Sequence, residues 1–398
     1  MKSITLEPIR DREKFLAKCP YKENILDTAI KAALEKIDFA IEAFGDYGFP
    51  TAASKGNVYE KIPNEFGWHT GFWTGILWIA YELTGDEKYK RIATHHVDTF
   101  LTRIDKRFSV EHHDMGFLYS PSCVAAYKLV GNETGKEAAL KAADNLISRY
   151  HEKGEFIQAW GHLDDPGAYR LIIDCLLNIP LLYWASEVTG DGKYEEIAYK
   201  HFKSTMANII REDASTYHTF YFDYETGAPS HGETAQGHAD DSAWARGQAW
   251  GIYGTMLTRI YKNDNDAIEG CKRVLNYMLN RLPDDYVPYW DLVFTEGDEP
   301  RDSSAAAITV CGIMELIKFL PDSDPDKNLY ENAAKHIMQS LYENYRANTD
   351  EKSNGLLLHS VANKPSCSGV DECNSWGDYF YMEALVRMKT DNEWKLYW

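Results

Sequence analysis

The sequence predicts an all-α protein whose helices are paired in hairpins, and the main reason is an internal repeat. Residues 82–93 read ELTGDEKYKRIA and residues 187–198 read EVTGDGKYEEIA, while a weaker copy, KLVGNETGKEAALKAAD, begins at Lys128. In each copy an amphipathic run ends at a glycine, which commonly adopts the left-handed conformation after a helix. In the first two copies an aspartate then stands where it can cap the next helix. Each copy therefore predicts a helix, a tight turn and a second helix.

Apolar residues at helical spacing extend this prediction along the chain to about twelve helices. We expect them at residues 22–44, 67–84, 87–104, 117–130, 134–151, 168–188, 191–210, 241–261, 265–282, 303–319, 326–346 and 374–389. Arranged as about six hairpins, they can close into a ring with one helix of each pair inside and the other outside. An open superhelix of stacked pairs is the alternative.

Three of the expected helices favour the closed ring. Their sequences, WHTGFWTGILWIAY, AWARGQAWGIYGTM and NSWGDYFYMEALV, are rich in Trp, Tyr and Gly. Helices that are apolar on all sides are buried and do not line an open groove. Between the helices, the alternating residues 217–224 predict a short strand, and the acidic, proline-containing residues 284–301 predict a loop. No low-complexity linker interrupts the chain, so we expect a single domain over residues 1–398.

The composition excludes several functional classes. The net charge is −19 and no dense run of Lys and Arg occurs, so we expect no nucleic-acid partner. No apolar stretch reaches the roughly 18 residues of a membrane span, and the first residues lack the apolar core of a signal peptide. The seven cysteines are scattered without a CxxC motif, which indicates reduced thiols in a cytoplasmic protein. Cys and His spacing typical of zinc is absent, so we expect no metal and no cofactor.

Two aspartates stand beside apolar runs. Asp174 lies in YRLIIDCLLNIPLLYW, where the sequence predicts the interior of an apolar helix. A buried carboxyl group there needs a partner, so it either makes a structural hydrogen bond or has a pKa raised by burial, as a general acid requires. Asp114 lies in HHDMGFLYSPS, where it could cap the following helix or take part in the same chemistry.

Aromatic and basic residues complete a pattern typical of a carbohydrate site. In HGETAQGHADDSAWARGQAWG, residues 231–251, Arg246 and Trp250 share one helix face, and Gln236 and Trp244 stand nearby. Arginine can bind a carboxylate through two parallel hydrogen bonds, and tryptophan offers a flat face for a sugar ring. A capped helix with two core tryptophans is the structural alternative. The GxSxG, GxGxxG and GxxxxGK[ST] patterns are absent.

The segments HHDMGFLYSPS, YRLIIDCLLNIPLLYWASEVTGD, TAQGHADDSAWARGQAWGIYG and WGDYFYMEAL resemble the unsaturated glucuronyl hydrolases of glycoside hydrolase family 88, over roughly residues 22–390. The resemblance implies an (α/α)6 barrel, in which six helical hairpins close a ring. It also implies a bacterial-type enzyme that acts after polysaccharide lyases. The substrate would be a small oligosaccharide whose terminal uronic acid carries a C4=C5 double bond, and hydration of this vinyl ether would release the neighbouring sugar.

The resemblance further implies roles for individual residues. Asp174 would protonate C4 and then handle the attacking water, and Asp114 would orient hydroxyl groups or stabilise positive charge at C5. The division of labour between these carboxyl groups stays open. Arg246 would contact the uronate. The other expected pocket residues are Trp68, His113, Trp160, His218, Gln236, Trp244, Trp250 and Tyr379.

One segment departs from the family pattern. Some relatives that prefer sulfated disaccharides carry Ser-x-x-Ser-x-Lys before the last helix, whereas KPSCSGVDEC here has Ser366 and Ser368 at a different spacing and no following lysine. Linkage and sulfation therefore stay open among chondroitin, hyaluronan and heparin fragments. The alternatives are an unsaturated rhamnogalacturonyl hydrolase acting on pectin fragments, a non-catalytic carbohydrate-binding protein and an epimerase. We expect a monomer, because a closed ring has no edge that must be paired.

Overall fold

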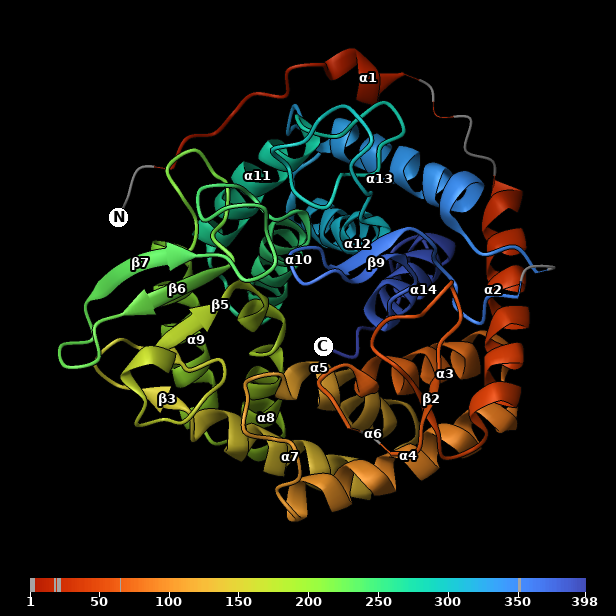
Figure 1. Cartoon of the computed structure of the whole chain (residues 1–398), viewed down its shortest axis with the longest axis horizontal. Coiled ribbons are helices and arrows are strands. Elements are labelled where there is room, and N and C mark those ends of the chain that lie inside the picture. Colours follow the sequence, from red (N-terminus) through yellow and green to blue (C-terminus); the bar gives the residue numbers. More distant parts are fainter. Residues whose placement is uncertain (1–3, 18, 20–22, 65, 350–351) are drawn as a thin grey trace.

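Helices form two concentric rings in the computed structural model, which describes residues 4–17, 19, 23–64, 66–349 and 352–398 (Figure 1). The inner ring consists of α3 (Thr70–Thr84), α5 (Met115–Tyr119) with α6 (Ala125–Val130), α8 (Pro180–Thr189), α10 (Ala245–Tyr261), α12 (Ser303–Phe319) and α14 (Ser375–Lys389). The outer ring consists of α2 (Glu23–Phe44), α4 (Glu87–Asp105), α7 (Glu133–Ile147), α9 (Lys193–Asn208), α11 (Asn265–Leu279) and α13 (Lys327–Ser340). A short helix, α1 (Arg12–Leu16), lies outside both rings.

Contacts between neighbouring inner helices close the ring. Helix α10 packs on α12, α12 on α14, and α14 returns to pack on α3, the first inner helix of the chain. Each inner helix also packs on an outer one, as in the pairs α3–α4, α8–α9, α10–α11 and α12–α13. The fold is therefore the (α/α)6 barrel that the sequence predicted. Among the described residues, no helix is both long enough and apolar enough to cross a membrane.

The sequence repeat has a specific structural role. Its glycines Gly85 and Gly190 end their helices in the left-handed conformation, with φ of 69° and 73°. The tyrosine that follows each turn donates a hydrogen bond to an aspartate on the preceding outer helix: Tyr89 to Asp38 at 2.7 Å, and the equivalent Tyr194 to Asp144 at 2.7 Å. The repeat thus links consecutive outer helices.

Short antiparallel hairpins are inserted between the helices. They are β1 (Phe49–Pro50) with β2 (Lys61–Ile62), β3 (Tyr150–His151) with β4 (Phe156–Ile157), the three-stranded sheet β5 (Arg170–Ile172), β6 (Thr219–Phe222) and β7 (Pro229–Glu233), and β8 (Ser360–Asn363) with β9 (Ser368–Glu372). The strand predicted within 217–224 is β6, and residues 284–301 are irregular, as predicted. Strands β1 to β5 have only two or three residues, and β7, β8 and β9 contain too few apolar residues to show an alternating pattern in the sequence.

The prediction of one long helix over residues 168–188 is wrong. Residues 170–172 form strand β5, residues Ile173–Leu177 form a 3-10 turn called η3, and the α-helix begins only at Pro180. Proline has no backbone N–H with which to continue a preceding helix, so it suits the first position of a new one. Residues 170–172 instead pair with β6.

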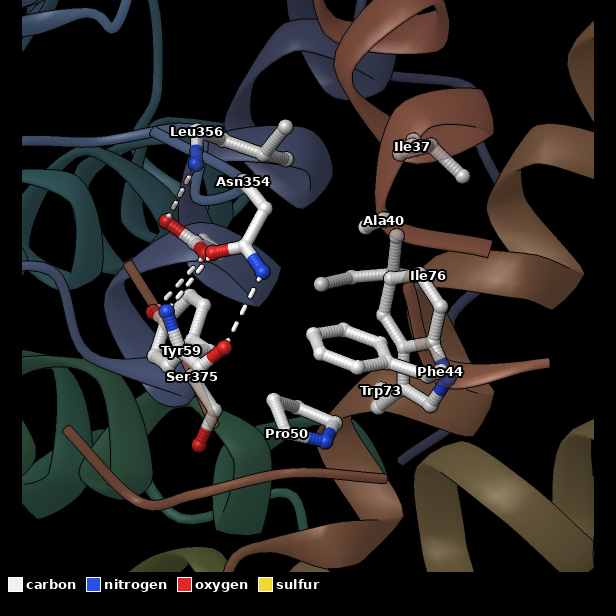
Figure 2. Close-up of a pocket in the computed structure, with 11 residues that line it drawn as sticks. Ile37, Ala40, Phe44, Pro50, Tyr59, Trp73, Ile76, Asn354, Leu356 and Ser375 are labelled. Carbon is white, nitrogen blue, oxygen red and sulfur yellow. Dashed lines mark hydrogen bonds between the residues drawn. The ribbon is translucent and has the colours of Figure 1, made fainter. Parts of the chain in front are cut away.

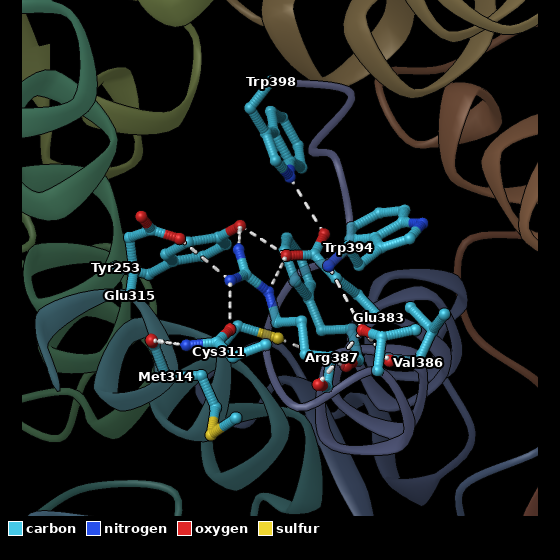
Figure 3. A network of polar contacts seen from close by, with 12 residues as sticks. Tyr253, Cys311, Met314, Glu315, Glu383, Val386, Arg387, Trp394 and Trp398 are labelled. Atoms are coloured by element: carbon cyan, nitrogen blue, oxygen red, sulfur yellow. Dashed lines mark hydrogen bonds and ion pairs between the residues drawn. The ribbon is translucent and has the colours of Figure 1, made fainter. Parts of the chain in front are cut away.

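A buried charged network joins three of the inner helices (Figure 3). Arg387 donates hydrogen bonds to Glu383 at 3.0 Å, to Glu315 at 2.9 Å and to the Tyr253 hydroxyl at 2.6 Å. The Tyr253 hydroxyl also bonds to Glu383, and the Trp398 indole donates to the other Glu383 oxygen at 2.9 Å. One buried guanidinium therefore ties together helices α10, α12 and α14.

Replacing this guanidinium should destabilise the barrel strongly. Arg387→Leu leaves the buried carboxylate of Glu383 without a cation and Glu315 with Lys318 alone, so we expect the free energy of unfolding to fall by about 3–5 kcal/mol. Urea denaturation measures the change. The matched control is Arg91→Leu, which removes an exposed ion pair with Asp46 and should cost less than about 1 kcal/mol. Equal losses in the two variants would contradict the role given to Arg387.

Candidate active site

The two predicted carboxyl groups come from segments that pack directly on each other. Asp114 precedes helix α5, and Asp174 lies in η3 after strand β5. Asn178 connects them: its Oδ1 accepts a hydrogen bond from the Phe117 backbone N–H at 2.9 Å, and its Nδ2 donates to the Asp174 carbonyl at 3.2 Å. A Cβ atom on Gly116 would come within 2.3 Å of the Asn178 Cα, so only glycine allows this approach.

The side chains meet at one imidazole. His113 Nε2 lies 3.4 Å from Asp114 Oδ1 and 3.3 Å from Asp174 Oδ1. On the other side of Asp114, His112 Nδ1 lies 3.0 Å from Oδ2. Asp114 occupies the N-cap position of α5, but its side chain makes no capping hydrogen bond, so the capping alternative is wrong. The side chains of Asp114 and Asp174 keep 14% and 19% of their surface exposed, which leaves both accessible to a ligand.

The environment separates the acidities of the two carboxyl groups. Burial raises the pKa of Asp174, and the nearby charge of Asp114 adds to this effect, while His113 only partly opposes it. Burial acts on Asp114 in the same direction, but His113 and His112 together hold the pKa of Asp114 below its usual value. Burial would lower the pKa of His113, but its two carboxyl neighbours raise it. The pair therefore favours a protonated Asp174 beside an ionised Asp114, the arrangement of an acid and an electrostatic partner.

Strand pairing brings His218 close to Asp174. Its carbonyl accepts a hydrogen bond from the Ile173 backbone N–H at 3.1 Å, which places His218 next to Asp174. Its Nδ1 accepts from the Ala235 backbone N–H at 3.0 Å. Burial lowers the pKa of His218 to about 3, and the positive charges of Arg246 and Arg170 act in the same direction. His218 is therefore a neutral imidazole at physiological pH.

Arg246 is buried and fully engaged. Its Nη1 donates to Asp302 at 2.9 Å and to the Val361 carbonyl, and its Nη2 donates to Gln236 Oε1 at 2.9 Å and to the Ala362 carbonyl at 2.7 Å. These four bonds use the four N–H groups of its terminal nitrogens. A uronate that contacted Arg246 through both nitrogens would have to displace some of these acceptors.

Aromatic side chains surround the carboxyl groups. Trp244 lies under the Arg246 guanidinium, 4.4 Å from its Cζ to the ring centre. Trp68 is partly exposed and stacks on Trp376 at 4.9 Å. Trp160 is 39% exposed, and its backbone pairs with that of His112, next to the site. Trp68 and Trp160 offer the partly exposed flat faces that a sugar requires. Trp244 is 4% exposed and packs against Arg246 and His218.

Trp250 and Tyr379 lie deeper than the pocket prediction implies. Trp250 is 2% exposed and packs on Phe117 and Phe380, with ring centres 5.3 and 5.4 Å away. Tyr379 is fully buried and packs on Phe72 at 5.3 Å. Both side chains therefore belong to the packed core of the barrel, and Trp250 contacts Phe117 of helix α5, which follows Asp114.

The segment before the last helix forms the β8–β9 hairpin. Ser366 and Ser368 are exposed near its turn, and the Ser366 backbone N–H donates to Asn363 Oδ1 at 3.1 Å. Arg246 holds the base of this hairpin through the carbonyls of Val361 and Ala362. The two serines therefore lie on a loop that the site itself anchors.

A separate cavity lies at the start of α14 (Figure 2). Its walls are largely apolar and include Phe44 and Trp73. The nearby Asp378 accepts hydrogen bonds from the Tyr59 hydroxyl at 2.9 Å and from the Leu356 backbone N–H at 3.0 Å. Burial raises the pKa of Asp378 to about 7. This carboxyl group anchors two loops and does not contribute to the site around His113.

The carboxyl pair also has the spacing of metal ligands. Within the part of the chain that the structure describes, His113, Asp114 and Asp174 form the one group of three whose potential ligand atoms lie within 4.8 Å of one another. The absence of a metal therefore stays a prediction.

Four residues that shape the site were not predicted from the sequence: His112, Asn178, Arg170 and Asp302. His112 is adjacent to His113, and Asn178 stands four residues after Asp174, so both had a local signal. Arg170 and Asp302 reach the site only through strand pairing and helix packing, which no local pattern reveals.

Comparisons with known proteins agree with this geometry. The model of Glycosyl Hydrolase Family 88 matches residues 48–393. The chain is 49% identical to an unsaturated chondroitin disaccharide hydrolase of Streptococcus pneumoniae over 100% of both chains, and 42% identical to an unsaturated glucuronyl hydrolase of Bacillus sp. strain GL1 over 88% of this chain and 93% of that one. The crystal structure of an unsaturated glucuronyl hydrolase from Streptococcus agalactiae superposes with a TM-score of 0.97 at 49% identity, covering 100% of both chains. A mutant of the Streptococcus agalactiae enzyme was solved in complex with dGlcA-GalNAc6S, and it matches with a TM-score of 0.90 at 46% identity over 100% of both chains.

The separated acidities predict opposite effects on stability when each aspartate is replaced by asparagine. Because the pKa of Asp174 is raised, the unfolded chain ionises first as pH rises, and the wild-type protein loses stability above the ordinary aspartate pKa. Asp174→Asn should therefore be more stable than wild type at pH 7, by a margin that shrinks towards pH 4. Because the pKa of Asp114 is lowered, Asp114→Asn should be less stable than wild type at pH 7. Urea denaturation between pH 4 and pH 7 measures both, and effects of the same sign would refute the assignment.

Proposed function

Since the chain belongs to glycosyl hydrolase family 88, we propose that Asp174 and Asp114 are the catalytic pair of an unsaturated glucuronyl hydrolase. The enzyme releases the terminal Δ4,5-unsaturated uronic acid from lyase-generated glycosaminoglycan oligosaccharides by hydrating the C4=C5 vinyl ether. Curated relatives that act on unsaturated chondroitin disaccharides favour this substrate class over pectin fragments and over a non-catalytic binding protein.

The observation that carries the roles of the two aspartates is that both lie within 3.4 Å of the His113 imidazole, where burial raises the pKa of Asp174 and the adjacent histidines lower that of Asp114. Asp174, whose pKa is raised, donates a proton to C4 of the sugar, and positive charge develops at C5 and the ring oxygen. The ionised Asp114 stabilises this charge. The Asp174 carboxylate formed in this step then takes a proton from the water that attacks C5.

The product of hydration breaks down without further help from an acid–base pair. The hydroxyl group added at C5 makes a hemiketal, and the ring opens to a ketone at C5. C1 then becomes a hemiacetal that expels the adjoining sugar. One water is consumed, with its hydrogen at C4 and its oxygen at C5, so the atoms balance.

The surrounding residues would bind and orient the sugar. Trp68 and Trp160 offer stacking faces, and neutral His218 offers a hydrogen-bonding nitrogen next to Asp174. Contact between the buried Trp244 and the sugar stays a prediction. Arg246 supplies a positive charge near Asp174 and fixes Gln236 and the β8–β9 hairpin, and a direct contact with the uronate stays a prediction. Ser366 and Ser368 would meet the second sugar if the hairpin reaches it.

We also propose a domain organisation, an oligomeric state and a location for the enzyme. The closed ring of inner helices supports a single catalytic domain over residues 1–398 that acts as a monomer. The scattered cysteines, none of them in a disulfide among the described residues, support a cytoplasmic location. No cofactor is needed for the hydration.

Asp174→Asn should abolish turnover while the fold is retained. The ultraviolet absorbance of the conjugated double bond falls as it is hydrated, so it follows the reaction directly with unsaturated chondroitin disaccharide as substrate. We expect the variant to lose about 10²–10⁴-fold in kcat, the range that general acid catalysis supplies. Circular dichroism confirms that the variant is folded.

Two outcomes would count against this function. Substantial residual turnover by Asp174→Asn would overturn its role as the acid. A constant absorbance with the wild-type enzyme, also with hyaluronan, heparin and pectin fragments, would overturn the reaction itself.

The same absorbance assay after dialysis of the enzyme against EDTA should give an unchanged rate, because we expect no metal. A loss of activity that added metal restores would make the group around His113 a metal site.

A further inference from the structure

An exposed strip of stacked side chains runs outward from the site across the three-stranded sheet. We call Trp160, Arg170, Tyr221 and His231 the sheet strip. The Arg170 guanidinium lies over the Trp160 ring at 4.4 Å and over the Tyr221 ring at 5.4 Å, and it donates to the Tyr221 hydroxyl at 2.9 Å. The rings of Tyr221 and His231 are stacked at 5.0 Å with an angle of 7°. The four side chains thus form one continuous surface of flat groups.

Strand register puts the sheet strip on the outer face of the sheet. Arg170 on β5 is directly opposite Tyr221 on β6, so their side chains point to the same side. Side chains of the alternate residues, Leu171 and Phe220, form the other face, which is buried. Trp160 is 39% exposed and the His231 side chain 55% exposed, so the strip faces solvent. Core packing does not explain why aromatic rings face solvent in a row, and such a surface is typical of a binding site.

The sheet strip is continuous with the catalytic site. The Trp160 backbone pairs with that of His112, which contacts Asp114. Arg170 precedes Asp174 by four residues, which span at most about 14 Å. The charge of Arg170 also lowers the pKa of His218 beside Asp174, so the two regions are within electrostatic reach. One end of the sheet strip, at Trp160, is therefore adjacent to the carboxyl pair.

Arg170 retains capacity to bind an anion. Its Nη1 donates to the Gly167 carbonyl and to Tyr221, whereas its Nη2 donates to none of the described residues, and the side chain is partly exposed. The far end of the strip differs, because His231 Nε2 lies 3.1 Å from Glu233 Oε1 and the local charge there is acidic. In a chain with a net charge of −19, this places the attraction for an anionic sugar at Arg170.

We propose that the sheet strip binds the third sugar of an unsaturated glycosaminoglycan tetrasaccharide, and this inference rests on the function proposed above. Glycosaminoglycans alternate a uronic acid with an amino sugar, so the third sugar from the unsaturated end carries a carboxylate. That carboxylate pairs with Arg170, and the sugar ring lies against Tyr221. The enzyme would then bind longer lyase products better than disaccharides.

The test compares the binding of unsaturated chondroitin tetrasaccharide and disaccharide by isothermal titration calorimetry. Asp174→Asn serves as the background, so that neither ligand is consumed. We expect the tetrasaccharide to bind more tightly than the disaccharide, and Arg170→Gln in this background to reduce that advantage by about fivefold, the effect of one exposed ion pair. The matched control is Arg91→Gln on the outer helix α4, which should leave both dissociation constants unchanged.

A second measurement does not depend on how Arg170→Gln folds. In the Asp174→Asn background, added salt should weaken tetrasaccharide binding more than disaccharide binding, because the extra ion pair is exposed and screened. Equal affinities for the two ligands, equal losses for both in Arg170→Gln, or equal salt dependence would overturn the proposal. Because these are binding measurements, a failure of turnover in the absorbance assay would refute the hydrolase and leave the strip as an oligosaccharide site.

Discussion

The burial of two carboxyl groups beside a single imidazole is the constraint on which the rest of the structure depends. A buried carboxylate is costly unless a partner compensates it, and Asp114 and Asp174 share His113 as that partner. The two segments can share it only because Asn178 bonds to both and Gly116 allows their close approach. The ring of inner helices holds these segments at its centre, so the fold serves to keep the two acids together.

Buried charged groups have more hydrogen-bond partners in the Arg387 network than at the site. In that network the Arg387 guanidinium bonds to two carboxylates and one hydroxyl, and the Trp398 indole donates to Glu383. At the site, Asp174 Oδ1 is buried, and its one ion-pair neighbour among the described residues is His113 Nε2, 3.3 Å away. A network with many bonds stabilises the fold, whereas a carboxyl group with few partners can give its proton to a substrate. The contrast supports a structural role for the first and a catalytic role for the second.

The sequence predicted the helical architecture well and the local structure at Asp174 poorly. Helix α12 spans Ser303–Phe319, as predicted from its periodicity, because capping and apolar spacing are local signals. Asp174 was singled out because it interrupts an apolar run, yet that run is a strand and a 3-10 turn, since pairing with β6, some 50 residues later in the chain, overrides local preference. Two other contacts also could not be predicted, because they form only in the tertiary structure. They are the bond from Arg246 to Asp302 and the stacking of Arg170 on Trp160. Periodicity also cannot say how deep a tryptophan lies, which is why Trp250 was expected in the pocket and lies behind it.

The transfer of a proton from Asp174 to C4 is the central claim, and the fate of hydrogen at C4 tests it most directly. The reaction is run in heavy water, where the exchangeable proton of Asp174 becomes a deuteron, and the product of the first turnovers is examined by proton NMR. We expect one deuteron at C4, delivered to a single face of the sugar, because the acid approaches from one side. A product without deuterium at C4, or with deuterium on both faces in equal amounts, would contradict protonation of C4 by an enzyme-bound acid.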